Sequence, residues 1–374
     1  MNLIQPLIAL SGLFFLGLPV VAASQTFSSE DAQFRLETVA EGLEHPWSLA
    51  FLPGGSMLVT ERAGRLRVIQ NGELLPQAVR GLPTPAVSGQ GGLLDIVLHP
   101  DFKENRTLFL SYAHRSSRGM TTRAARAQFE DEELKNVTVI FEALPRSNTS
   151  RHFGGRMAFD ASGYLYISVG DRGEMDRAQD TRDDAGGVHR ITVNGEPAPG
   201  NPGLGDPNIN NTLLTWGNRN IQGMTVHPET GDIWTHEHGP RGGDEINILN
   251  PGTNYGWPEI TYGIGYSGLP ITLDTKKDGM AQPLHYWDPS IAPSGMAFYA
   301  GAEFPKWQGS LFVGALKLRK LVRLEIENGQ VVGEEDLLTT LKERIRDVRT
   351  APDGTLWLLT DSPEGKVYRM VPAQ

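Results

Sequence analysis

The sequence predicts an all-β fold, a six-bladed β-propeller built from four-stranded antiparallel blades. The 374 residues include 43 Gly and 25 Pro, more than an average protein, which favours many turns and hence many short strands. Apolar segments of four to six residues alternate with turn residues, as in all-β proteins. One strand–turn–strand pattern recurs through the chain, at residues 47–69, 94–112, 157–169, 224–248, 296–324 and 348–370.

Each copy is supported by its local chemistry. Turns rich in Pro, Asp and Gly follow the first strand of most copies, at residues 53–55, 99–101, 160–163, 227–231 and 352–354. The repeat leaves about 55 residues per copy, enough for a blade of roughly 40–50 residues and its loops. A closed ring also removes the free sheet edges that would make such apolar strands aggregate. One helix is expected, over Glu335 to Arg344.

The amino-terminal segment has the pattern of a secretory signal. An apolar stretch runs from Leu3 to Val21, and Val21-Ala22-Ala23 resembles a signal-peptidase site. We expect residues 1–23 to be cleaved, which leaves 24–374 as a single propeller domain in the periplasm or secreted. The alternative is an uncleaved anchor, which two prolines in the stretch disfavour.

Composition excludes several classes of protein. With 34 Lys and Arg against 44 Asp and Glu the net charge is −10, which argues against non-specific nucleic-acid binding. The sequence contains no Cys, so disulfides, thiol nucleophiles and Cys-ligated zinc are excluded. No later stretch is long and apolar enough for stable membrane insertion. No Gly-x-Gly-x-x-Gly turn stands between a predicted strand and a predicted helix, as NAD binding would require.

Four polar segments, three of which contain glycine, stand at one phase of the repeat, directly before the first strand of a copy. They are residues 88–94, 151–156, 217–223 and 344–348. Equivalent loops of a propeller meet at one end of its channel, which is the usual binding site. We therefore expect one pocket to gather Gln90, His152, Arg219, Asn220, Arg344 and Arg346. The alternative is that each is an ordinary turn or surface residue.

The fourth copy contains the densest polar stretch, residues 237–245 followed by 254–258. Carboxylates, an Asn, and carbonyl groups exposed by Gly and Pro suit a hard cation, most plausibly calcium. His236 and His238 are weak evidence for zinc, and a solvated acidic loop is the remaining alternative.

Seven motifs in this order resemble the soluble PQQ-dependent aldose sugar dehydrogenases, relatives of soluble quinoprotein glucose dehydrogenase. They occupy residues 89–94, 99–102, 152–156, 217–220, 237–247, 254–258 and 344–348. The resemblance spans about residues 35–372. It implies a six-bladed propeller that oxidises the anomeric carbon of aldose sugars to lactones, by hydride transfer to PQQ.

The resemblance also implies residue roles. His152 matches the general base for the anomeric hydroxyl, and Arg219 with Asn220 matches the pair beside the reactive quinone carbonyl. The implied contacts to the tricarboxylate quinone are Gln90, Tyr266, Lys317, Arg344 and Arg346. Gly239 and Pro240 match carbonyl donors to the calcium that polarises the quinone. Glu245 and Tyr255 match a second, structural calcium site.

Two positions depart from the family pattern. Arg151 precedes the base where the glucose dehydrogenases carry an acid, and Gly187 stands where relatives usually have Lys. The implied partners are small-molecule aldoses and an unidentified electron acceptor, for a monomer or weak dimer. Two rival functions remain: a calcium-dependent propeller lactonase, and a non-catalytic extracellular binding propeller.

Overall fold

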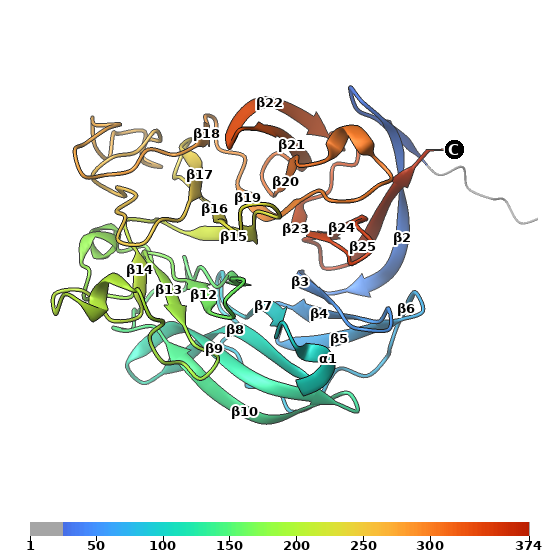
Figure 1. Cartoon of the computed structure of the whole chain (residues 1–374), viewed down its shortest axis with the longest axis horizontal. Coiled ribbons are helices and arrows are strands. Elements are labelled where there is room, and N and C mark those ends of the chain that lie inside the picture. Colours follow the sequence, from blue (N-terminus) through green and yellow to red (C-terminus); the bar gives the residue numbers. More distant parts are fainter. Residues whose placement is uncertain (1–24, 374) are drawn as a thin grey trace, which may run out of the picture.

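The structure, a computed structural model, describes residues 25–373, so the predicted signal segment 1–23 lies outside the described residues. Six antiparallel sheets are arranged around a central axis (Figure 1), which confirms the predicted six-bladed propeller. The first strand of each repeat lies innermost and later strands lie progressively outward. Within residues 25–373 no helix is long and apolar enough to cross a membrane.

The first three blades follow the chain in order. Blade 1 contains β3 (Pro46–Phe51), β4 (Met57–Glu61), β5 (Arg65–Gln70) and β6 (Glu73–Leu74). Blade 2 contains β7 (Leu93–Leu98), β8 (Thr107–Ser116), β9 (Gly119–Glu130) and β10 (Glu133–Glu142), with the short helix α1 (Phe102–Asn105) in its first turn. Blade 3 contains β11 (Met157–Phe159), β12 (Leu165–Ser168), β13 (Val188–Ile191) and β14 (Leu213–Thr215).

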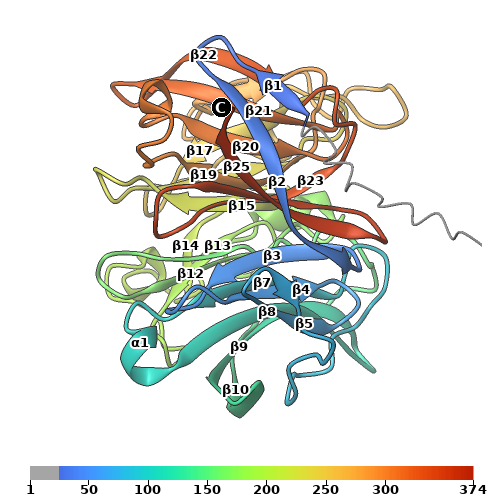
Figure 2. The same cartoon turned by 90° about the vertical axis from the view of Figure 1, so that its right-hand side faces the viewer.

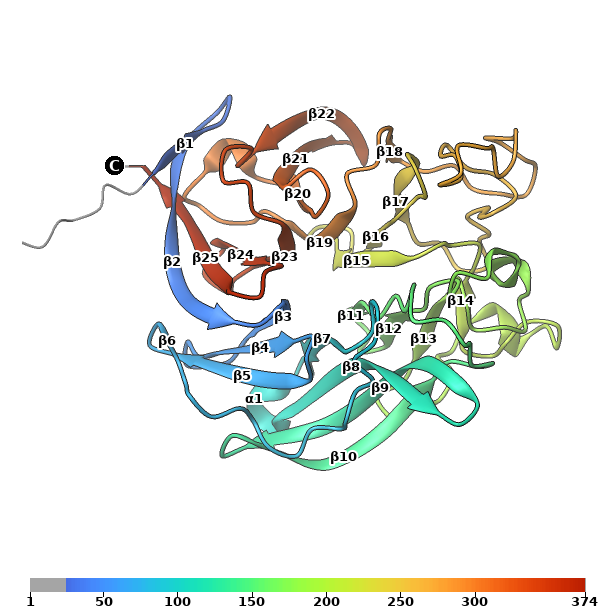
Figure 3. The same cartoon turned by 180° about the vertical axis from the view of Figure 1, so that it is seen from behind.

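The next two blades repeat the pattern (Figure 3). Blade 4 contains β15 (Ile221–Val226), β16 (Ile233–Glu237), β17 (Asp244–Ile248) and β18 (His285–Trp287). Blade 5 contains β19 (Pro293–Phe298), β20 (Leu311–Ala315), β21 (Lys320–Glu327) and β22 (Gln330–Leu337). Short 3₁₀ turns are at Met175–Gln179, Pro202–Leu204 and Pro305–Trp307.

Blade 6 joins the two ends of the described chain. Its inner strands are β23 (Ile345–Thr350), β24 (Leu356–Thr360) and β25 (Gly365–Pro372). Its outer strand is the amino-terminal β2 (Gln33–Leu43), which pairs with β25 and is flanked by β1 (Thr26–Ser28) (Figure 2). Residues distant in sequence thus complete one sheet, which closes the ring without a free seam.

The hydrophobic core is a ring of layers between neighbouring blades. Apolar clusters fill all six interfaces, for example Leu58 with Leu110 between blades 1 and 2, and Phe312 with Leu356 between blades 5 and 6. The inner strands therefore bury both faces, which explains why their sequences are apolar runs rather than strict alternations.

The helix predicted over Glu335 to Arg344 is wrong. Glu335 lies in β22, where it pairs with Arg323 of β21 in the ladder and by an ion pair of 2.9 Å. Leu338 and Lys342 have φ values of 59° and 57° in the left-handed region, which an α-helix does not accommodate. The charged residues of segment 335–344 belong to the end of β22 and to the short connection that leads to the next strand.

One backbone feature recurs at the end of the propeller that carries the predicted pocket. A residue directly after the second strand, or in blade 2 within it, donates its N–H to the carbonyl of a residue before the first strand. This contact is made by Arg62 to His45, Ala113 to Gly92, His238 to Asn220, Leu316 to Ala292 and Asp361 to Arg344. Both kinds of loop therefore meet at the same channel mouth.

Candidate active site

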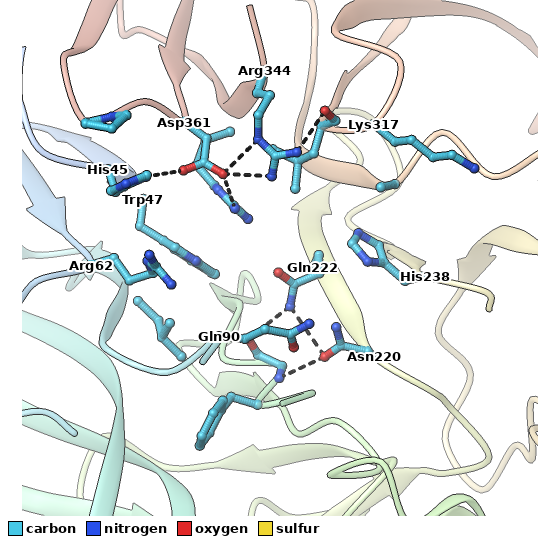
Figure 4. Close-up of a pocket in the computed structure, with 17 residues that line it drawn as sticks. His45, Trp47, Arg62, Gln90, Asn220, Gln222, His238, Lys317, Arg344 and Asp361 are labelled. Atoms are coloured by element: carbon cyan, nitrogen blue, oxygen red, sulfur yellow. Dashed lines mark hydrogen bonds and ion pairs between the residues drawn. The ribbon is translucent and has the colours of Figure 1, made fainter. Parts of the chain in front are cut away.

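A cavity of about 590 Å³ opens at this mouth (Figure 4). Its lining comes from blades 1, 2, 4, 5 and 6 and from the loop before blade 3. The polar lining side chains are His45, Arg62, Gln90, Asn220, Gln222, His238, Lys317, Arg344, Arg346 and Asp361. The structure thus brings together five predicted cofactor contacts, Gln90, Asn220, Lys317, Arg344 and Arg346.

The cavity has an excess of positive charge. Arg62, Lys317, Arg344 and Arg346 face a single carboxylate, Asp361. Asp361 binds Arg344 at 2.9 Å and Arg346 at 2.8 Å, and its other oxygen contacts His45 Nδ1 at 2.8 Å. Burial alone would raise the pKa of Asp361, but Arg346, His45 and Arg344 outweigh it and hold the pKa far below its usual range. The cavity is therefore suited to an anion.

His152 is buried beside the cavity and joined to its wall through Gln90, whose Oε1 accepts the His152 backbone N–H at 2.7 Å. Its Nδ1 contacts Asp171 Oδ1 at 2.6 Å, and Asp171 Oδ2 accepts the Trp257 indole N–H at 2.9 Å. Burial lowers the pKa of His152, although Asp171 partly offsets this. The imidazole is thus neutral near pH 7, with its proton on Nδ1 and a basic Nε2.

Arg219 and Asn220 occupy the loop before β15 and are both buried. Arg219 donates to the carbonyl oxygens of His238 and Gly239, both at 3.0 Å. Its backbone N–H donates to Glu237 of β16, and Asn220 Oδ1 accepts the Gly154 N–H at 3.1 Å. The guanidinium is fixed in position beside His152, whose pKa its charge helps to lower.

The predicted metal loop is held by Asp244. Its carboxylate accepts the Gly239 N–H at 2.8 Å, the Ser290 hydroxyl at 2.6 Å and two further backbone N–H groups. This shapes the turn through Gly239 and Pro240 next to Arg219. The Gly239 carbonyl accepts from Arg219 in this arrangement.

Glu245 and Tyr255 lie apart from the cavity lining, near Glu237. Burial and then the Glu237 charge raise the pKa of Glu245 well above its usual value, and burial raises the pKa of Glu237 to about 7. Asn247 contacts Glu245 at 3.4 Å, and its Oδ1 is buried without a partner. The buried Glu245 carboxylate, with only this long contact, and the unpaired Asn247 oxygen are donors that fit a hard cation. Within residues 25–373 no three His, Cys, Asp or Glu side chains form a metal-binding group.

Aromatic residues near the loop divide into two kinds. Tyr266 is 72% exposed, and its ring lies 5.9 Å from the Arg219 guanidinium, outside the cavity lining. Tyr262 stacks on Tyr286 with ring centres 3.9 Å apart. Trp257 and Trp287 are buried, and Trp287 packs between blades 4 and 5.

The two departures from the family pattern have structural explanations. Arg151 is exposed, and its charge is among those that lower the His152 pKa. A Cβ at Gly187 would lie 2.4 Å from Leu213 Cδ1, so the position has no room for a side chain without repacking.

The sequence analysis missed Asp171, His45, Arg62 and Asp361. Arg62 and Asp361 directly follow the second strands β4 and β24, and Asp171 is the third residue after β12. Because antiparallel strands bring the end of the second beside the start of the first, these positions belong to the same mouth. Inspection of the residues after each second strand would have identified Arg62, Asp171 and Asp361.

Next to the cavity, a second polar cluster lies among the innermost strands. Arg156 contacts Asp347 at 2.9 Å and Asp95 at 3.4 Å, and Arg349 contacts Asp95 and Asp347, both at 2.8 Å. Arg156 also donates to the Gln222 carbonyl at 2.6 Å and lies 4.0 Å from the Trp47 ring centre. This axial ion network joins four blades and the loop before β11.

Comparison with known proteins agrees with this architecture. Aldose sugar dehydrogenase YliI of Escherichia coli (strain K12) is 41% identical over 96% of this chain and 98% of its own length. A glucose dehydrogenase crystal structure is 45% identical with TM-score 0.88, covering 91% of this chain and 99% of that one. The PQQ-bound aldose sugar dehydrogenase of Streptomyces coelicolor is 28% identical with TM-score 0.75, covering 91% and 98%. Residues 43–369 match the glucose/sorbosone dehydrogenase family, and the chain belongs to that family.

Proposed function

We propose that this protein is an exported PQQ-dependent dehydrogenase that oxidises aldose sugars at the anomeric carbon to lactones. The observation that carries the proposal is a cavity with four cations and one carboxylate, next to a buried neutral imidazole. Cations of this kind suit a tricarboxylate quinone, and a neutral imidazole suits proton abstraction. The relative from Streptomyces coelicolor, which is described as PQQ-bound, supports this cofactor.

Lys317, Arg344 and Arg346 would bind the carboxylates of PQQ, with Gln90 and Asn220 as hydrogen-bonding neighbours and Tyr266 at the margin. When bound, PQQ supplies a two-electron acceptor for the hydride of the sugar C1–H. Asp361 holds Arg344 and Arg346 before the cofactor arrives, because it pairs with both. The arginines are thereby preorganised rather than mobile.

His152 acts as the general base in this proposal. Asp171 accepts a hydrogen bond from the Nδ1–H group, so Nε2 is free to take the proton of the anomeric hydroxyl. The imidazolium that forms is stabilised by the Asp171 carboxylate, which is itself fixed by Trp257 and the Gly173 N–H. Arg219 adds a fixed positive charge next to this centre.

Calcium would act at two places. Near the cavity, the Gly239 and Pro240 carbonyls would hold an ion that acts as a Lewis acid. Around Glu245, the buried carboxylates and the unpaired Asn247 oxygen would hold a structural ion. The Tyr255 hydroxyl donates to the Ile248 carbonyl at 2.6 Å, so Tyr255 would contribute its backbone oxygen.

The substrate range follows from the open mouth. Sugar hydroxyls that point to water discriminate weakly between epimers, whereas hydroxyls buried against polar partners discriminate strongly. We propose broad activity on mono- and disaccharide aldoses. We propose none on ketoses, whose anomeric carbon carries no hydrogen to transfer as hydride. The electron acceptor is a separate partner, and the protein acts in the periplasm or outside the cell as a monomer or weak dimer.

The test is reconstitution of the purified protein with PQQ and calcium, followed by dye reduction with glucose, galactose, xylose, maltose and fructose. The proposal predicts reduction with the aldoses, loss of activity in chelator, and recovery when calcium and PQQ return. Full activity in excess chelator, with the metal shown to be removed, would contradict the calcium role. Fructose oxidised as fast as glucose would contradict C1 hydride transfer.

A further inference from the structure

Arg172 is a buried cation that the proposed chemistry does not use. It is 2% exposed, and within residues 25–373 no carboxylate oxygen lies within 4.0 Å of its guanidinium nitrogens. Arg156 and Arg323 are as deeply buried, but both form ion pairs with carboxylates. Burial, with the nearby charge of Arg177, lowers the pKa of Arg172 to about 9. A charge buried without a counter-ion lowers stability, so Arg172 is a candidate for a role in the adjoining site.

The guanidinium of Arg172 binds the chain on both sides of His152. Its Nη1 donates to the Arg151 carbonyl oxygen at 2.7 Å, and its Nη2 donates to the Thr149 carbonyl oxygen at 3.0 Å. Its central carbon lies 3.6 Å from the ring centre of Phe153, the residue after His152. One side chain therefore contacts the residues directly before and directly after the proposed base.

The backbone held in this way is in an uncommon conformation. His152 has a φ of 51° and Arg172 a φ of 59°, both in the left-handed region that residues with a side chain rarely adopt. Such a conformation persists only where the surrounding contacts impose it. The Thr149 hydroxyl also donates to the Arg172 carbonyl oxygen, so the two segments are joined in both directions.

The same two segments carry the base and the carboxylate that orients it. Asp171 directly precedes Arg172, and its Oδ1 contacts His152 Nδ1 and accepts the Gly173 N–H, both at 2.6 Å. A shift of either segment would change this contact and with it the direction in which Nε2 points. Arg172 opposes such a shift, because it holds the His152 segment from the residue next to Asp171.

We propose that Arg172 is a positioning residue for His152 and that it joins segment 149–153 to the turn that carries Asp171. The inference rests on the proposed function, in which His152 is the general base. Arg172 acts on the sugar only through the imidazole. A planar guanidinium suits this role, since it bridges two carbonyl oxygens while its face lies on an aromatic ring. A Lys ammonium has neither the fork nor the face.

The first experiment measures glucose oxidation by variants reconstituted with PQQ and calcium. The variants are Arg172→Met and Arg172→Lys, each alone and combined with His152→Ala. Arg172→Lys keeps the buried charge, so it serves the same comparison if Arg172→Met does not fold. The matched control is Arg323→Lys on β21, which changes an equally buried arginine whose partners are carboxylates outside the cavity lining.

Arg172→Met should lower kcat by up to about 10²-fold, the cost of misplacing a reacting group by about 1 Å, and Arg172→Lys by less. KM for glucose, the affinity for PQQ and the kcat of Arg323→Lys should not change. In the His152→Ala background neither Arg172 substitution should lower kcat further, because the group through which Arg172 acts is gone. Losses that multiply in the double variants, or a wild-type kcat in Arg172→Met, would overturn the inference.

The second experiment needs no turnover. Proton NMR of the purified protein detects imidazole N–H groups that a hydrogen bond protects from exchange with water, and the His152 signal is the one absent from His152→Ala. We expect Arg172→Met to broaden or remove this signal and Arg323→Lys to leave it unchanged. A signal that survives in Arg172→Met would show that Arg172 does not position the imidazole. If wild type gives the signal but oxidises no sugar with PQQ, the proposed function fails, and the signal alone decides the role of Arg172.

Discussion

Two groups of charged side chains meet on the propeller axis, and they differ in charge balance. The axial ion network sets Arg156 and Arg349 against Asp95 and Asp347, and all four are tied by ion pairs of 3.4 Å or less. The adjoining cavity sets four cations against Asp361 alone. A balanced buried network stabilises one arrangement of the blades, whereas an unbalanced one is suited to receiving an anion.

The two groups are also physically joined. Arg156 donates to the backbone carbonyl of Gln222 at 2.6 Å and to that of Arg346 at 3.3 Å, and both residues line the cavity. The comparison teaches that residue type alone does not identify a site, because arginines and aspartates occur in both. What separates them is whether positive and negative charges balance.

The largest expected effect is on catalytic turnover. We expect His152→Ala to lower turnover by on the order of 10²–10⁴, the range for loss of a general base. The thermal unfolding midpoint and PQQ binding should not change, because His152 is outside the axial network. His114→Ala on β8 is the matched control. Normal turnover in His152→Ala would place the base elsewhere.

The next effect is on stability. Arg156→Met removes one partner of a buried network and should lower the free energy of unfolding by about 3–5 kcal/mol. Urea denaturation followed by tryptophan fluorescence measures this loss. Arg182→Met, at a side chain 74% exposed, should change it by less than about 0.5 kcal/mol. Equal stabilities of the two variants would remove the distinction between the axial network and the surface.

A smaller effect should separate binding from stability. Lys317 is exposed and lines the cavity, so Lys317→Gln should weaken PQQ binding by roughly 10–100-fold, the value of one charge-assisted hydrogen bond. Its unfolding free energy should equal that of wild type. Equilibrium dialysis gives the PQQ affinity, with Lys103→Gln in α1 as control. A loss of stability with unchanged affinity would assign Lys317 to the structural group.

The smallest effect concerns pH. Burial lowers the pKa of His152 below its usual 6.5, and the base is active when neutral. kcat/KM should therefore be level above this pKa and fall as the pH drops through it, on the acid side of 6.5. Arg151→Glu replaces a charge that lowers the pKa by one that raises it, so the acid limb should move to higher pH. A limb that stays in place would show that Arg151 does not tune His152.

The sequence predicted the number of blades because the repeat is a local pattern, visible in turns such as residues 53–55 and 352–354. It also predicted which loops converge, since equivalent phases of a closed ring share one end. It could not place β2 in blade 6, because strand pairing over more than 300 residues leaves no local signal. The strand at Glu335 was mistaken for a helix because β22 is an outer, largely exposed strand whose charged residues lack the apolar run of the inner strands.

The site was predicted in part for the same reason. Gln90 and Asn220 stand in polar, glycine-containing loops, and Arg344 and Arg346 stand in a charged segment at the start of β23. Asp171 and Asp361 follow apolar strands and look like ordinary turn residues until the partner loop is known. The axial network was not predicted, since Asp95 is a single charge inside an otherwise apolar strand and Asp347 stands among arginines that were assigned to the cavity.

The most direct test of the central claim, that an excess of cations over carboxylates makes the cavity a site for a tricarboxylate quinone, is calorimetric titration of the purified protein with PQQ and with its trimethyl ester. Both titrations are made in the same calcium-containing buffer. The account predicts one PQQ bound per chain and an ester affinity at least 100-fold weaker, because about two charge-assisted contacts are lost. Equal affinity for PQQ and the ester would contradict the claim that these cations bind the cofactor.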